Sequence, residues 1–226
     1  MDQNPAVFQG KRAQGYDDFI EHWMPNYKEF MQDIPSLLAK GLTAQEAALL
    51  IVGSGTGNEI QQIAKEQPSW YLVGIDPSPE MVDIARRKLA GHPQVRLHRG
   101  YVGDLPLDTL FDGATLILVL HFLPDDGSKL RLLQDIAQRL KSGSMLLFTG
   151  IFGTPEQLQA GLEALRPKLI TYQPAEEVDR RIQTLPQRIH HVSEERLQAL
   201  FTEAGFTEWT PIFRHTIYGA WTCKKD

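Results

Sequence analysis

Three glycines at alternate positions follow an apolar run in the first quarter of the sequence. The stretch reads Leu49-Leu50-Ile51-Val52-Gly53-Ser54-Gly55-Thr56-Gly57, and an amphipathic segment follows it. Four consecutive apolar residues favour a strand buried on both faces, as in a parallel sheet. Glycine permits positive φ and close approach to the backbone, and a helix start offers free N–H groups with a partial positive charge. The stretch predicts a strand, a turn and a helix start that bind a small ligand with a polar or anionic end.

A carboxylate ends the next apolar run, Val73-Gly74-Ile75-Asp76. Asp76 lies about twenty residues after the glycine turn, where an acidic residue can accept hydrogen bonds from ribose hydroxyls. Nicotinamide and adenosyl ligands both carry such a ribose. The glycines are spaced Gly53-x-Gly55-x-Gly57, whereas a dinucleotide fingerprint reads Gly-x-Gly-x-x-Gly. The spacing therefore favours an adenosyl ligand.

Several other side chains could act on a second substrate. His121 follows the apolar run 114–120 and could take a proton from an acceptor oxygen or nitrogen, although a lone histidine serves equally well in packing or hydrogen bonding. Aromatic residues could cover a ligand, line a substrate wall or pack in a helical core; they are Tyr16, Trp23, Tyr27 and Tyr172. No cysteine and histidine cluster has metal-ligand spacing, so no metal is expected.

Two basic runs also stand out. Arg86-Arg87-Lys88 lies in the middle of an expected helix, where a solvated face is expected rather than a nucleic-acid patch. Arg180-Arg181 could form a solvated face as well, or bind an acidic substrate.

The elements that must position these residues alternate between strand and helix. Strands are expected at 49–52, 70–75, 94–98, 114–120 and 145–150. Helices are expected at 58–66, 79–89, 128–140 and 193–204, the last one capped by Ser193 and ended by Gly205. This alternation indicates parallel pairing with right-handed crossovers. Two closing strands, 207–213 and 216–223, are joined by a link short enough for an antiparallel hairpin.

Two segments lie outside this alternation. Residues 16–40 are expected to form short helices broken at Pro25 and Pro35 and ended by Gly41, with Thr43 as a cap before the first strand. Further helices are expected at 154–165, ending near Pro167, and at 175–183. We therefore expect residues 1–46 to form a helical lid or flank. Residues 47–226 would form the ligand-binding domain, with 151–192 as a helical insertion on the substrate side.

The bulk composition narrows the class of protein. The 226 residues suit one domain with additions, and the formal net charge of -5 lacks the basic excess of a nonspecific nucleic-acid binder. A single cysteine, Cys223, excludes an intrachain disulfide framework and fits a reducing compartment. The polar N-terminus lacks the plan of a signal peptide, and no apolar run could span a bilayer. We expect a cytoplasmic protein, monomeric or homodimeric, without membrane or nucleic-acid partners.

Taken together, these motifs resemble the class I S-adenosylmethionine-dependent methyltransferases. The resemblance covers residues 47–150 closely and residues 193–223 more loosely. Its motifs are Gly53-Ser54-Gly55-Thr56-Gly57, Val73-Gly74-Ile75-Asp76-Pro77-Ser78-Pro79-Glu80-Met81, Ala85-Arg86, Phe111-Asp112, Leu120-His121-Phe122-Leu123, Leu140-Lys141-Ser142-Gly143-Ser144 and Glu203-Ala204-Gly205-Phe206.

The resemblance implies a Rossmann-like, doubly wound α/β fold. Its seven-stranded sheet would be mostly parallel with an antiparallel last strand, and S-adenosylmethionine would lie across the carboxyl ends of the early strands. The implied cofactor residues are Gly53, Ser54, Gly55 and Gly57 at the methionine and ribose parts, Asp76 at the ribose hydroxyls, Pro77 and Met81 beside the adenine, and Tyr101 and Val102 at its far edge. Residues bordering the methyl group and substrate would be Leu118, Leu120, His121 and Phe122.

Two positions depart from the family pattern. Many members carry an acidic residue two places before the first glycine, where it organises the amino-acid end of the cofactor, and this sequence has Ile51 there. The loop after the third strand often carries Asp next to Gly to receive the adenine amino group, but Gly100 is followed here by Tyr101. Another residue must hold the methionine end, or the grip there is weaker.

The expected activity is methyl transfer from S-adenosylmethionine to an O, N or C atom of a small molecule, with S-adenosylhomocysteine as product. Tyr16-Asp17-Asp18 and Pro25-Asn26-Tyr27 also resemble the flank of carboxy-S-adenosylmethionine synthases of the wobble-uridine pathway. Those enzymes need an arginine for the extra carboxylate, and the sequence alone does not identify one. A tRNA-modification enzyme and a noncatalytic S-adenosylmethionine-binding module remain alternatives, and the glycine spacing disfavours a nicotinamide oxidoreductase.

Overall fold

A seven-stranded sheet forms the centre of the computed structural model, which describes residues 8–42 and 46–226. Its strands are β1 (Ala48–Val52), β2 (Tyr71–Asp76), β3 (Val95–Arg99), β4 (Phe111–Ile117), β5 (Leu140–Ile151), β6 (Phe206–His215) and β7 (Tyr218–Lys225). They lie in the order β3-β2-β1-β4-β5-β7-β6, and β7 runs antiparallel to both of its neighbours while the other pairs are parallel. The predicted doubly wound sheet with an antiparallel last strand is confirmed.

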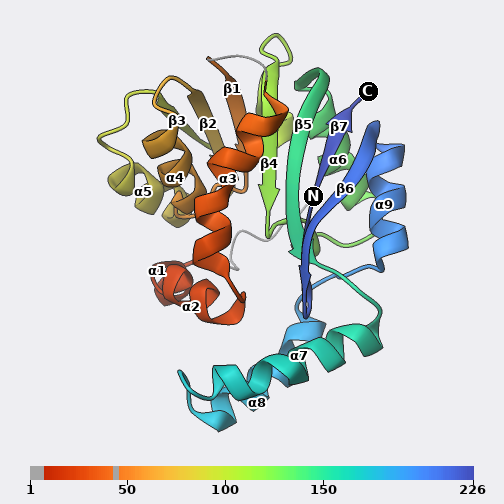
Figure 1. Cartoon of the computed structure of the whole chain (residues 1–226). Coiled ribbons are helices and arrows are strands. Elements are labelled where there is room, and N and C mark those ends of the chain that lie inside the picture. The colour runs from red at the N-terminus through yellow and green to blue at the C-terminus, as the bar shows by residue number, and fades with distance from the viewer. Residues whose placement is uncertain (1–7, 43–45) are drawn as a thin grey trace.

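Helices cover both faces of this sheet (Figure 1). They are α1 (Lys11–Gln14), α2 (Tyr16–Trp23), α3 (Tyr27–Gly41), α4 (Asn58–Glu66), α5 (Pro79–Lys88), α6 (Ser128–Ala137), α7 (Pro155–Leu169), α8 (Ala175–Thr184) and α9 (Glu194–Glu203). Side chains along β1 alternate between the two faces: Leu49 and Ile51 pack with α3 and α4, and Leu50 and Val52 pack with α6 and α9. Among the described residues, no helix combines the length and apolar character that crossing a membrane requires.

The helices outside the alternating core lie at one edge of the sheet. In Figure 1, α1 and α2 from the N-terminal flank, and α7 and α8 from the segment after β5, lie beyond the carboxyl ends of the parallel strands. This edge is where open α/β sheets bind their ligands. The two segments that break the strand–helix alternation are therefore placed to enclose a ligand.

Two prolines do not end helices as predicted. Pro35 lies within α3 and Pro167 within α7, whereas Pro25 does separate α2 from α3. A proline inside a helix costs about 3 kcal/mol because it removes a hydrogen bond and clashes with the preceding turn. In α3 this cost is offset by burial of an apolar face that includes Phe30 and Ile34. The flank is thus partly core: α3 belongs to the helical layer on the sheet. The cap predicted at Thr43 falls outside the described residues.

The fourth strand ends earlier than predicted. β4 covers Phe111–Ile117, and Leu118 adopts a left-handed conformation with φ of 59° before a short 3₁₀ helix at Leu120–Phe122. The apolar run to Leu120 suggested a longer strand because its hydrophobicity continues past the point where the backbone turns. The chain leaves the sheet at Leu118, at its carboxyl edge.

Candidate functional site

Two adjoining cavities lie at the carboxyl edge of the sheet. The first, of about 550 Å³, is lined by the glycine turn and the end of β2, and we call it the turn cavity. The second, of about 690 Å³, is lined by α2, α8 and the residues around them, and we call it the helical cavity. Residues common to both linings are Phe8, Tyr16, Leu118, Phe122 and Arg188. The two cavities therefore share a wall.

The glycine turn leaves open space where side chains would otherwise project. Gly53, Gly55 and Gly57 all have positive φ, at 68°, 51° and 85°. A Cβ atom added to Gly55 would meet no heavy atom closer than 3.9 Å, so it would occupy the cavity itself. A Cβ on Gly53 would overlap the Val119 side chain. Glycine at position 55 thus gives a ligand access to the backbone.

Asp76 lies beside this turn and keeps free acceptor capacity. Its carboxylate accepts hydrogen bonds from the Gly55 N–H at 2.9 Å and the Ser78 N–H at 2.8 Å. Burial raises the pKa of Asp76, and these two hydrogen bonds partly oppose that effect. An ionised carboxylate has about four acceptor positions, so two remain for a diol. The buried Ser54 hydroxyl, in the same lining, has no hydrogen-bond partner among the described residues. The turn cavity therefore fits the ribose of an adenosyl cofactor.

A buried acid lies next to the position where Ile51 departs from the family pattern. Glu59 of α4 lines the turn cavity, and its carboxyl group accepts a hydrogen bond from the Thr115 hydroxyl. Thr115 is the strand partner of Ile51, so their side chains share a face of the sheet. Burial raises the pKa of Glu59 from its ordinary 4.5 to about 7, although the hydrogen bond from Thr115 opposes the shift. Glu59 could not be recognised from the sequence, because its position in α4, and not a motif, brings it to this place.

Most of the predicted cofactor residues come together in the turn cavity. Those in its lining are Gly53, Ser54, Gly55, Asp76, Pro77, Met81 and Leu118.

Four predicted cofactor residues are not brought to that lining. Gly57 precedes α4 and packs against α5, where a Cβ would crowd Leu89. Val102 and Leu120 are each only 2% exposed and belong to the core. Tyr101 lies in the loop after β3, where its N–H donates to Asp104 at 2.8 Å. The family resemblance implied that these residues lie near the cofactor, and none of the four is in the lining of the turn cavity.

His121 lines the helical cavity and not the turn cavity. Its imidazole is buried. This burial, and to a smaller extent the nearby charge of Lys129, lowers the pKa of His121 to about 3. The Ile151 N–H approaches its Nδ1 atom at 3.5 Å. A neutral imidazole of such low basicity is poorly suited to accept a proton, so its chemistry favours hydrogen bonding over the predicted general-base role. Within the described ranges, no three His, Cys, Asp or Glu side chains gather as a metal site would require.

The predicted substrate-side aromatic residues all line one or both cavities. Tyr16 and Phe122 belong to the shared wall, Tyr27 lines the turn cavity, and Trp23 and Tyr172 line the helical cavity. The Tyr172 ring, which follows α7, contacts the His22 ring of α2 with centroids 4.2 Å apart. The flank and the insertion therefore meet over the helical cavity.

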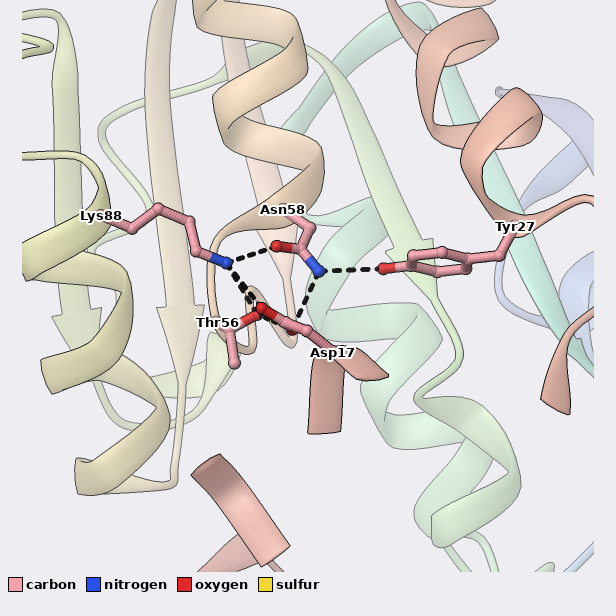
Figure 2. Close-up of polar contacts among 5 residues, drawn as sticks. All are labelled: Asp17, Tyr27, Thr56, Asn58 and Lys88. Atoms are coloured by element: carbon pink, nitrogen blue, oxygen red, sulfur yellow. Dashed lines mark hydrogen bonds and ion pairs between the residues drawn. The ribbon is translucent and has the colours of Figure 1, made fainter. Parts of the chain in front are cut away.

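A polar network ties the flank to the glycine turn (Figure 2). The Asp17 carboxylate of α2 accepts hydrogen bonds from Thr56 at 2.5 Å, Asn58 at 2.9 Å and Lys88 at 2.9 Å. Asn58 also donates to the Tyr27 hydroxyl of α3 at 3.2 Å. Burial would raise the pKa of Asp17, but the hydrogen bonds from Thr56 and Lys88 prevail and lower it.

This network could not be predicted from the sequence, since it joins residues far apart along the chain. Arg86 and Arg87 are exposed as expected of a solvated face, whereas Lys88 turns inward to Asp17. No local spacing indicates that partnership.

Comparison with known proteins supports the interpretation of the turn cavity. A family model described as a methyltransferase domain matches residues 49–143, the part of the chain that forms this cavity's strands and turn. The chain is 34% identical over 114 residues to trans-aconitate 2-methyltransferase of Methylobacterium nodulans, an alignment covering 49% of this chain and 40% of that protein. It is 30% identical over 80 residues to carboxy-S-adenosyl-L-methionine synthase of Campylobacter hominis, covering 35% of this chain and 34% of that protein.

A solved structure extends the likeness to the whole chain. The complex of DhpI with SAH superposes with a TM-score of 0.64, covering 99% of this chain and 96% of that chain at 15% identity. This similarity concerns the fold. The chain spans less than half of the length of the two curated relatives above. Residues 49–143 therefore resemble a methyltransferase domain, and the whole chain has the fold of the superposed structure.

Proposed function

We propose that the protein transfers a methyl group from S-adenosylmethionine to an O, N or C atom of a small molecule. The observation that carries this proposal is the shared wall between the two cavities. A cavity suited to an adenosyl cofactor adjoins a second one of about 690 Å³, which is within the usual range for small-molecule sites. Leu118 and Phe122 line both, so a molecule in the helical cavity would reach the edge of the cofactor cavity.

Each part of the turn cavity has a role in this proposal. The backbone at Gly53 and Gly55 receives the cofactor closely, Asp76 accepts hydrogen bonds from its ribose hydroxyls, and Pro77 and Met81 border its base. When bound, S-adenosylmethionine supplies a methyl group activated by a positively charged sulfur. The protein must then align the acceptor and exclude water, a contribution that orientation alone can make large. The apolar side chains of the shared wall suit that task.

Glu59 is our candidate for holding the amino-acid end of the cofactor. Its carboxyl group lies beside position 51, where many relatives of this fold carry an acid, and it lines the turn cavity. A cationic amino group close to this carboxyl would favour its ionised form and lower its pKa again. Cofactor binding to Glu59 would therefore release a proton near neutral pH, because the unliganded pKa is about 7.

Two measurements test the proposed function. Calorimetry with S-adenosylhomocysteine should show binding, and NAD should show none; the reverse would favour the oxidoreductase. The second measurement follows a labelled methyl group from S-adenosylmethionine to a panel of small molecules and to tRNA. A labelled small molecule supports the proposal, labelled tRNA supports the tRNA-modification alternative, and binding without any transfer indicates the noncatalytic module.

The carboxy-S-adenosylmethionine synthase alternative has one specific observation in its favour. Arg188 lines both cavities, which supports a role for its guanidinium group in binding an extra carboxylate on the cofactor. A comparison of carboxy-S-adenosylmethionine with S-adenosylmethionine by calorimetry decides the case. Tighter binding of the carboxylated form, lost in Arg188→Gln, would replace methyl transfer as the proposed reaction. The cytoplasmic location and the monomeric or homodimeric state stay predictions, to be checked by cell fractionation and light scattering.

A further inference from the structure

The helical cavity carries a local excess of positive charge. Its described lining includes four arginines, Arg12, Arg180, Arg181 and Arg188, and one carboxylate, Asp18. The protein as a whole has a formal net charge of -5, so this excess runs against the overall balance. A cavity whose walls are this basic attracts anions.

The arginines of this cavity come from three separate parts of the chain. Arg12 belongs to α1 of the flank, Arg181 to α8 of the insertion, and Arg188 to the segment after it. Arg181 is paired with Glu177 at 2.9 Å, one turn earlier in its helix. Among the ion pairs of the described residues, none includes Arg12 or Arg188. Arg180 is absent from these ion pairs as well, so three of the four arginines line the cavity without a carboxylate partner from the described chain.

These guanidinium groups lie close enough to repel one another. Burial lowers the pKa of Arg12, and the charges of Arg188 and Arg181 lower it further. Like charges gathered around a cavity destabilise the ionised groups, and an anion placed between them reverses the sign of the interaction. Guanidinium groups bind carboxylate and phosphate through paired hydrogen bonds, so these anions fit the cluster best.

Aromatic side chains form part of the remaining lining, together with aliphatic and polar ones. The rings of Phe19 and Trp23 are stacked, with centroids 5.4 Å apart and planes inclined by 24°. Arg181 lies over the Phe19 ring at 5.0 Å, which joins the basic cluster to this aromatic surface. Phe122 and Tyr16 extend the surface to the wall shared with the turn cavity. An occupant with an anionic group and a flat apolar body would satisfy both parts at once.

We propose that the helical cavity binds the methyl acceptor through a carboxylate or phosphate group held by Arg12, Arg181 and Arg188, with the acceptor's apolar body against Phe19 and Phe122. The acceptor is thus an organic acid with an unsaturated or aromatic body. Its identification as a methyl acceptor rests on the function proposed above, whereas the anion site itself rests on the cavity alone.

Binding measurements with small acids test this site directly. The probes are cinnamate and phenyl phosphate, with cinnamamide and benzyl alcohol as their neutral counterparts, each measured by calorimetry with and without saturating S-adenosylhomocysteine. The acids should bind and the neutral probes should bind at least about tenfold more weakly, since charge-assisted hydrogen bonds are lost. The stronger of the two acids identifies the anion as a carboxylate or a phosphate.

Variants locate the site. Arg188→Gln and Arg12→Gln should each weaken binding of the acids about tenfold and leave S-adenosylhomocysteine affinity within about twofold. Arg188→Lys should retain part of the affinity because it keeps the charge but loses the planar fork. Arg87→Gln, an exposed arginine of α5 outside both cavities, is the matched control and should change nothing.

The outcomes separate the two proposals. Equal binding of acids and neutral probes, no acid binding at millimolar concentration, or unchanged affinity in both arginine variants would each overturn the anion site. Failure of the wild-type protein to bind S-adenosylhomocysteine would instead overturn the proposed function, while the acid measurements made without it still decide the anion site.

Discussion

The walls of the turn cavity and of the helical cavity are built in different ways. Three polar groups beside the glycine turn, Ser54, Glu59 and Asp76, are between 5% and 8% exposed. The carboxyl groups of Glu59 and Asp76 are hydrogen-bonded to the core or the backbone. The helical cavity is lined by side chains from surface helices, and its Arg12, Arg188 and Tyr172 are exposed. The turn cavity is built around the strand ends and the glycine turn, and Tyr16 and Tyr27 of the flank complete its lining. The helical cavity requires the flank and the insertion to meet.

This contrast indicates where each kind of specificity resides. A substitution in the turn cavity should change cofactor binding and stability together, since the same residues serve the core. A substitution in the helical cavity should change acceptor binding and leave the fold intact. The following variants test that division, in order of decreasing expected effect.

The largest effect is expected from Gly55→Leu. Its side chain would project into the turn cavity, so affinity for S-adenosylhomocysteine should fall on the order of a thousandfold, or about 4 kcal/mol, as measured by calorimetry. The matched control is Gly143→Leu in β5, where φ is 78° and no heavy atom lies within 4 Å of an added Cβ. Both variants carry the same kind of backbone strain, but only the first faces the cavity. Equal cofactor affinity in the two would contradict the assignment of the turn cavity.

The next largest effect concerns Glu59 and pH. Its pKa is about 7 in the folded protein and 4.5 ordinarily, so the unfolded chain loses its proton first as pH rises. Between these two values the folded state becomes progressively less stable, and above pH 7 the loss reaches about 3 kcal/mol. Glu59→Gln should remove this loss: it should stabilise the protein at pH 8, with little change at pH 4, in urea denaturation.

The same variant should weaken cofactor binding. S-adenosylmethionine affinity should fall about tenfold in Glu59→Gln, because a charged partner for the amino group is lost. Glu66→Gln, at the exposed end of the same helix, is the control and should alter neither property. A Glu59→Gln protein with unchanged stability at pH 8 would argue against the buried, protonated state of this carboxyl.

A smaller effect is expected from the network in Figure 2. Lys88→Met removes the cation that pairs with Asp17, and partly exposed ion pairs contribute up to about 1 kcal/mol. The free energy of unfolding should fall by that amount or less, and amide hydrogen exchange should accelerate in α2. Arg86→Met breaks the exposed pair with Asp83 in the same helix and serves as the control. Equal amide exchange rates in α2 for both variants would show that Lys88 does not hold the flank in place.

The smallest effect on stability is expected from Tyr172→Ala. The side chain is 56% exposed, so the free energy of unfolding should change by no more than about 0.5 kcal/mol. Its ring nevertheless contacts His22 above the helical cavity, and acid binding should weaken a few fold when the cavity opens there. A loss of stability above 1 kcal/mol, seen in thermal denaturation, would place Tyr172 in the core.

The alternation of strands and helices and the glycine turn could be predicted from the sequence because short-range signals determine them. Apolar runs of strand length, glycines and capping residues such as Ser193 each act within a few residues, and the expected helix at 58–66 matches α4. Boundaries failed where tertiary contacts outweigh local preference. α3 continues through Pro35 because its buried face is held by the sheet and α4.

The cofactor side of the site could be predicted in part, and the acceptor side only as candidate residues. Asp76 and Gly55 follow from spacing along one strand–turn–strand unit. Glu59 and Lys88 could not be found in this way, because Glu59 acts through a neighbouring strand and Lys88 through a helix 71 residues earlier in the chain. The basic cluster likewise joins segments whose proximity depends on the complete fold.

Leu118 has an implication for how this protein has changed over time. A leucine in the left-handed region costs about 1–2 kcal/mol relative to glycine, and this residue lines both cavities. Drift under selection for stability alone would favour glycine or asparagine at this position. If related sequences from distant organisms also carry leucine at this position, selection has kept the wall between cofactor and acceptor. It has done so although leucine lowers the stability of the fold there.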